Sequence, residues 1–152
     1  MNFSDQETAL MRELQRDSSA SLADLAQKCH MSQSTAWRKV QELEQSGIIR
    51  KRVAILDPAK AGCKLAVLAS ITLTDHSEAT LAGFGRLIEG HPEIVECLAT
   101  SGQADYRMKI RVADVEAYEQ FMTHILLRAP FVREVHSSFV LKELKSTTEL
   151  PL

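Results

Sequence analysis

Residues 1–47 alternate apolar and polar positions with the period of an α-helix. The spacing of Ala9, Leu10 and Leu14 predicts a first helix whose N-terminus Asp5 can cap. The pattern stops near residues 17–19, where Asp-Ser-Ser interrupts the apolar stripe. The chain therefore opens with a short amphipathic helix.

Two further helices are predicted, each beginning after a serine. Ser21 precedes a short helix and Ser32 a longer one, and each hydroxyl can accept a hydrogen bond from the first helical turn. The longer helix ends at Gly47, because glycine enters the left-handed conformation at little steric cost. Two helices joined by a turn of about three or four residues are typical of a helix-turn-helix, whose second helix enters the major groove of DNA.

From about residue 65 the pattern changes to alternating strands and helices. The expected order is a strand at 65–74, a helix at 78–90, strands at 94–101 and 105–112, a helix at 114–128 and a strand at 132–145. This order predicts a ferredoxin-like βαββαβ domain in which helices cover one face of the sheet. The other face needs a partner, which for a domain of this size is usually a second copy of the chain.

A short apolar run at 53–56 lies between the two halves and predicts a strand, ended by Asp57 and Pro58. The expected fold class is therefore α+β. An all-α, winged-helix-like helix-turn-helix domain occupies residues 1–50, a connecting strand and hinge 51–62, and the ferredoxin-like oligomerisation and effector-binding domain 63–152.

The composition is that of an ordinary globular protein, with 45% hydrophobic and 25% charged residues. No apolar run approaches the ~20 residues of a membrane helix, and the N-terminus lacks a secretory signal, so we expect a cytoplasmic protein. Cys29, Cys63 and Cys97 form no C-x-x-C pair, so neither a disulfide framework nor a structural metal is expected, and no cofactor is implied.

Polar side chains at the start of the third helix are candidates to contact DNA. Gln33, Ser34 and Thr35 suit base edges, whereas Arg38 suits guanine or a phosphate. The indole of Trp37 either packs on the sugar–phosphate wall or covers the junction with the first helix. Basic residues after the helix suit phosphates, which add affinity without sequence choice. The predicted DNA-binding residues are Ser32, Gln33, Ser34, Thr35, Trp37, Arg38, Gln41, Arg50, Lys51 and Arg52.

The sequence gives less support to an enzyme or to a metal or redox sensor. None of the histidines belongs to a catalytic motif such as H-E-x-x-H or a Cys–His pair with ligand spacing, so we do not expect an enzyme. A metal or redox sensor based on Cys29-His30 or Cys97 would need distant ligands.

Five stretches carry a family resemblance: LADLA at 22–26, MSQSTAWRKV at 31–40, LEQSGII at 43–49, SGQADY at 101–106 and SSFVLKELKSTT at 137–148. In this order and spacing, over essentially the whole chain, they resemble the Lrp/AsnC (leucine-responsive, feast/famine) transcription regulators. The family often has glycine in the turn where this chain has His30, so a left-handed residue other than glycine is expected there. The opening of the first helix, at 6–8, also departs from the family pattern.

The resemblance implies that an effector, typically an amino acid, binds between subunits near Gly102 and Asp105. The chemistry agrees, because a glycine N–H can meet a carboxylate and an aspartate can accept from an ammonium group. A plain turn between two strands would use the same residue types. The expected effector-binding residues are Ser101, Gly102, Gln103, Asp105, Tyr106 and Ser138.

The resemblance also implies a homodimer that assembles further, possibly to an octamer, with the strand at 53–56 helping to pair subunits. Two recognition helices would then meet double-stranded promoter DNA about 34 Å apart or at a multiple of that distance. An effector bound across a subunit boundary would favour one assembly and so change DNA affinity. The predicted function is a sequence-specific transcription regulator that responds to a small amino acid; the alternative is an effector-independent architectural DNA-binding protein.

Overall fold

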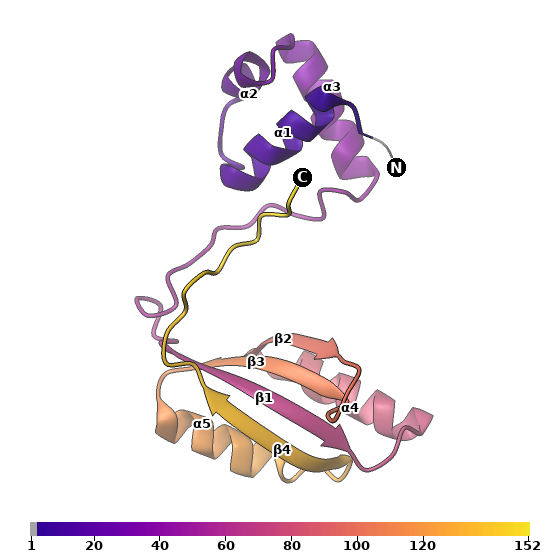
Figure 1. Cartoon of the computed structure of the whole chain (residues 1–152), viewed down its shortest axis with the longest axis vertical. Coiled ribbons are helices and arrows are strands. Elements are labelled where there is room, and N and C mark those ends of the chain that lie inside the picture. The colour runs from indigo at the N-terminus through magenta and orange to yellow at the C-terminus, as the bar shows by residue number, and fades with distance from the viewer. Residues whose placement is uncertain (1–2) are drawn as a thin grey trace. The chain divides into compact units, whose positions relative to one another are not determined.

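The computed structural model describes residues 3–152 and divides into two compact units, which are considered separately (Figure 1). The first unit comprises Met1–Ile55 together with Leu144–Leu152, and the second comprises Leu56–Glu143. The sequence pattern assigns residues 144–152 to the second domain, whereas the structure groups them with the first. Gln15 explains this, because its side-chain amide accepts a hydrogen bond from the Leu150 N–H at 2.6 Å.

The first unit contains three helices, α1 (Asp5–Arg16), α2 (Leu22–Lys28) and α3 (Gln33–Gln45). The apolar stripes predicted from the sequence meet in one core, which contains Leu10, Met11, Leu14, Leu25, Cys29, Val40 and Leu43. The turn before α3 passes through His30 at φ 51°, so the expected left-handed residue is confirmed.

Serine side chains begin all three helices. Ser4, and not Asp5, caps α1: its hydroxyl accepts from the Glu7 N–H at 3.3 Å, and the Glu7 carboxylate accepts from the Ser4 N–H at 2.9 Å. The expectation for Asp5 was wrong because this reciprocal capping box requires a glutamate three residues after the cap, a spacing that Ser4 alone satisfies. The predicted caps at Ser21 and Ser32 are confirmed.

The second unit is the expected βαββαβ sandwich. Its elements are β1 (Leu65–Leu73), α4 (Glu78–Gly90), β2 (Ile94–Ala99), β3 (Tyr106–Val112), α5 (Val115–Phe121) with a π-helical turn (Met122–Leu126), and β4 (Val132–Phe139). The strands lie in the order β2-β3-β1-β4 and every neighbouring pair is antiparallel, which is the ferredoxin-like topology.

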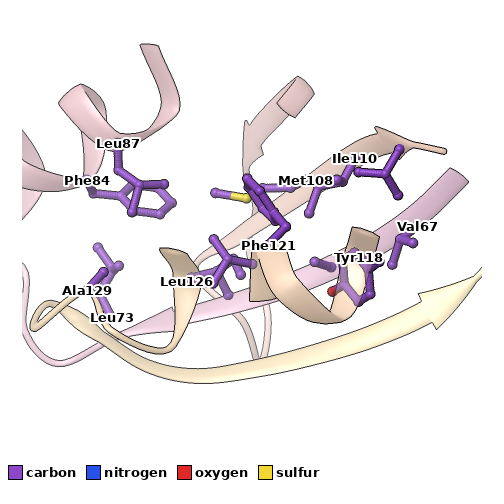
Figure 2. Packing of buried hydrophobic residues seen from close by; sticks show 13 residues of the cluster. Val67, Leu73, Phe84, Leu87, Met108, Ile110, Tyr118, Phe121, Leu126 and Ala129 are labelled. Atoms are coloured by element: carbon purple, nitrogen blue, oxygen red, sulfur yellow. The ribbon is translucent and has the colours of Figure 1, made fainter. Parts of the chain in front are cut away.

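The two helices of this unit pack on one face of the sheet. Figure 2 shows the side chains that meet there: Phe84 and Leu87 come from α4, Tyr118 and Phe121 from α5, and Met108 from β3. Alternate strand residues point to the opposite face, where Glu143 accepts from Lys109 at 2.5 Å and from Arg111 at 2.6 Å.

Two strand expectations are corrected. The strand β4 ends at Phe139 rather than at 145: Phe139 pairs with Val67 and the Val140 N–H donates to Ala66, but β1 begins at Leu65, so residues after 141 have no partner left in it. The run 53–56 forms no strand within residues 3–152. Its apolar side chains are open to solvent, with Val53 and Ile55 60% and 76% exposed. A strand requires a neighbouring strand, and this chain alone does not supply one to that run.

Among residues 3–152, the helices lack the combination of length and apolar character that a membrane span needs.

Candidate DNA-binding and effector sites

The first turn of α3 presents an exposed polar surface. The Ser32 hydroxyl accepts from the Thr35 N–H at 3.2 Å and lies 3.0 Å from the Ser34 hydroxyl, so these groups bond mainly to one another. Gln33 is exposed, and its amide makes no hydrogen bond to any residue of the described chain. Its donor and acceptor are therefore free for an external partner.

Two arginines, one on α3 and one after its end, are paired with glutamates of α3. Arg38 lies 2.5 Å from Glu42, with the two side chains 61% and 50% exposed. Arg52 contacts Glu44 at 2.8 Å, and Gln41 also donates to Glu44, at 3.3 Å. For Arg38 or Arg52 to bind a phosphate, each must leave a carboxylate.

The other basic residues on α3 and after its end, Lys39, Arg50 and Lys51, differ in their contacts. Lys39 points toward α1 and contacts Glu7 at 3.0 Å, where its side chain is only 14% exposed. Arg50 and Lys51 are exposed and form no ion pair within residues 3–152. The indole of Trp37 is 56% exposed, so it covers the junction between helices only in part.

The segment predicted to bind an effector is the loop between β2 and β3. Ser101, Gly102 and Gln103 are exposed, and Gly102 has φ 127°, in the region that disfavours any residue with a side chain. An added Cβ at Gly102 would meet no atom within 4 Å, so space remains beside its backbone.

Asp105, the expected acceptor for an ammonium group, already has two partners. Its Oδ2 accepts from the Leu73 N–H at 2.8 Å, and its Oδ1 lies 3.0 Å from His76 Nε2. The Leu73 N–H, followed by the contact with His76, lowers the pKa of the Asp105 carboxyl. The carboxylate thus joins the loop to the end of β1.

Tyr106 and Ser138 lie on opposite faces of the sheet. The Tyr106 ring packs against Phe84 at a centroid distance of 4.6 Å, on the face that the helices cover. Ser138 pairs with Leu68 on the other face, where both are exposed. These two residues do not line one pocket with the loop.

The structure adds residues that sequence reasoning missed. A hollow of about 500 Å³ beside the loop is lined by Ser70, Thr72, Gln103, Ala104, Arg107, Glu134 and His136, of which only Gln103 was expected. Arg107, Ser70 and His136 face one another across three strands, and His136 lies 2.9 Å from Glu134. Charged residues at alternate positions of these strands could have suggested a site in the sequence. Their proximity, however, follows only from the register of the paired strands.

Within residues 3–152, no three side chains of metal-binding type lie close enough to form a site. Burial raises the pKa of the Cys29 and Cys97 thiols, which favours their protonated, less reactive form.

Comparison with known protein families matches both units of the chain. Residues 4–50 match a model described as winged helix-turn-helix DNA-binding, and residues 66–150 match the Lrp/AsnC ligand binding domain. The chain belongs to the Lrp/AsnC family.

Individual relatives agree along nearly the whole length. The glutamate uptake regulatory protein of Zymomonas mobilis is 34% identical over 139 residues, which cover 91% of this chain and 84% of the relative. The transcriptional activator DecR of Escherichia coli K12 is 32% identical over 143 residues, or 94% of each chain.

Solved structures of Lrp/AsnC proteins also superpose closely. An AsnC family transcriptional regulator from Agrobacterium tumefaciens has a TM-score of 0.93 at 38% identity, covering 98% of this chain and 97% of the other. A Neisseria meningitidis regulator, solved as an L-Met complex, has a TM-score of 0.95 at 27% identity, covering 99% and 97%. The predicted family and fold class are confirmed, and this Lrp/AsnC protein is a DNA-binding transcription regulator with a ligand-binding domain.

Proposed function

We propose that this Lrp/AsnC regulator reads promoter DNA with the N-terminal half of α3 and changes its DNA affinity when an amino acid binds at residues 101–105. The free, exposed amide of Gln33 at the start of α3 carries the first half of the proposal. A glutamine at the tip of a recognition helix forms two hydrogen bonds with adenine in the major groove.

The exposed polar and basic groups on α3 and after its end have roles in this proposal. Arg38 exchanges Glu42 for a guanine or a phosphate, and Trp37 packs on the sugar–phosphate wall. Arg50 and Lys51 add phosphate contacts, which make the affinity depend strongly on salt. The proposed interface keeps the residues expected from the sequence: Ser32, Gln33, Ser34, Thr35, Trp37, Arg38, Gln41, Arg50, Lys51 and Arg52.

The effector proposal rests on the loop and the adjoining hollow. The Gly102 backbone is open to a carboxylate, Asp105 supplies an acceptor for an ammonium group, and Arg107 and Glu134 add one charge of each sign. The Neisseria relative was solved with L-Met, which makes an amino acid the first class of effector to test.

A second copy of the chain is the proposed partner of two uncovered apolar surfaces. Leu68 and Leu98 are 48% and 52% exposed on the sheet, and the run 53–56 is extended and exposed. Pairing of these surfaces would form a dimer, and further assembly, possibly to an octamer, would place several recognition helices on one promoter.

The DNA proposal is tested with fragments selected from a random duplex pool by the wild-type protein. We expect Arg38→Ala to raise the Kd for the selected fragment about tenfold at matched salt. Arg86→Ala, which removes an exposed arginine from α4, is the matched control and should leave Kd unchanged. Equal affinity of Arg38→Ala and wild type would show that α3 is not the reading helix.

The effector proposal is tested by a thermal-shift screen of the twenty amino acids, because a bound ligand raises apparent stability by mass action. We expect at least one amino acid to raise the melting temperature and to change both the DNA affinity and the oligomer size. DNA binding that is unaffected by every amino acid would favour an architectural, effector-independent protein.

A further inference from the structure

His76 occupies the outer side of the Asp105 carboxylate. It lies in the connection between β1 and α4, and its Nε2 is 3.0 Å from Asp105 Oδ1. The imidazole is 65% exposed whereas the Asp105 side chain is 24% exposed. The inner oxygen, Oδ2, is held by the backbone N–H of Leu73 at 2.8 Å. The oxygen that a ligand can reach is thus the one that His76 covers.

We propose that His76 is a built-in competitor of the effector, holding the place on Asp105 that the ammonium group of an amino acid takes when it binds. The inference rests on the proposed effector function and adds the residue that regulates this site. An ammonium group brings three donors where the imidazole brings one, so the effector replaces the single bond and gains further partners.

The contact can be exchanged without loss of the fold. Asp105 keeps its bond to Leu73 when His76 leaves, and the positive charge of Arg133 continues to favour the ionised carboxylate. The N-terminus of α4 also stays capped, because the Ser77 hydroxyl accepts from the Thr80 N–H at 3.3 Å independently of His76. A contact between two partly exposed side chains is weak, which suits a contact that opens and closes.

The contact with His76 therefore lowers the apparent affinity for the effector, and removal of the imidazole should restore that affinity. When a binding-competent state is only partly populated, the apparent affinity falls by that fraction. Removing His76 leaves Asp105 open at all times, so the Kd for an effector amino acid should fall roughly threefold to fivefold.

The test compares four proteins by calorimetric titration with each of the twenty L-amino acids. They are the wild type, His76→Ala, Asp105→Asn and His124→Ala, the last removing an exposed histidine elsewhere as a matched control. We expect His76→Ala to bind the effector amino acid severalfold more tightly, His124→Ala to match the wild type, and Asp105→Asn to lose binding.

A second readout uses the unmodified protein, so that a folding defect in a variant does not decide the matter. In protein labelled with ¹⁵N at histidine, the amino acid should move the His76 Nε2 resonance toward that of a histidine free in solvent. An amino acid that binds the wild type but leaves both this resonance and the His76→Ala affinity unchanged would overturn the competitor role alone. Absence of binding by every amino acid to every protein would overturn the effector function as well.

Discussion

The two proposed binding regions use their polar groups in opposite ways. On α3 the amide of Gln33 is free, and Trp37 is exposed. In the loop before β3 both oxygens of Asp105 are already bonded, and Tyr106 packs in the core. A regular helix with one buried stripe leaves its other faces to a partner, whereas a loop bonds to whatever groups the fold brings near it. If the proposals are correct, DNA meets a free amide at Gln33 and displaces only the exposed pairs of Arg38 and Arg52, whereas an effector must exchange the contacts of Asp105 itself.

The largest effect that follows from this contrast is on stability. Asp105→Ala removes the acceptor of the buried Leu73 N–H, so we expect the free energy of unfolding to fall by about 2 kcal/mol. Urea denaturation of the variant measures it. Asp105→Asn keeps an acceptor at the same place and should cost less, and equal stability of all three proteins would contradict a structural role for this carboxylate.

On α3 the expected pattern is reversed. Gln33→Ala should change the free energy of unfolding by less than about 0.5 kcal/mol, because the side chain is exposed and unbonded. Its affinity for the selected DNA should nevertheless fall about tenfold, or ~1.4 kcal/mol. The measurements are denaturation and fluorescence anisotropy, and a stability loss as large as that of Asp105→Ala would remove the contrast between the regions.

A smaller effect concerns how α3 is held against α1. The Ser4 N–H and hydroxyl, followed by Lys39, hold the pKa of Glu7 at about 2, below its ordinary value of 4.5. Since the folded state lowers this pKa, the stabilisation is present above about pH 4.5 and is lost as the pH falls toward 2. Glu7→Gln should cost about 1 kcal/mol at neutral pH and flatten the acid limb of the stability curve, as measured by urea denaturation against pH. An unaltered acid limb would contradict the lowered pKa of Glu7.

The smallest effect tests the exchange of Arg38. Glu42→Gln frees the guanidinium and removes a negative charge from α3, the helix proposed to face DNA, so DNA affinity should rise about threefold. Anisotropy titration at matched salt measures the change. A decrease in affinity would mean that Glu42 positions Arg38 for DNA rather than competing with DNA.

Periodic features of the sequence predicted most of the fold. The buried stripe of Ala36, Val40 and Leu43 and the alternation along β1 follow from the periods of helix and strand. The ends of helices and strands were less predictable. The cap of α1 depends on a reciprocal bond to Glu7, and the end of β4 depends on where β1 begins.

The proposed DNA-binding surface and the proposed effector region differ in the same respect. The exposure of Gln33 follows from its place on a helix, but the partners of Asp105 lie about thirty residues away in sequence, at Leu73 and His76. Arg107 and His136 come together only through the register of β1 with two other strands. Local patterns do not encode such pairings.

Trp37 allows the most direct test of the central claim, that α3 enters the DNA groove. It is the only tryptophan of the chain and is 56% exposed on α3, so fluorescence excited selectively at tryptophan reports this surface alone. Acrylamide quenching is measured for the free protein and at saturation with the selected DNA. The account predicts that DNA lowers the quenching constant severalfold; an unchanged constant while the protein is fully DNA-bound would contradict it.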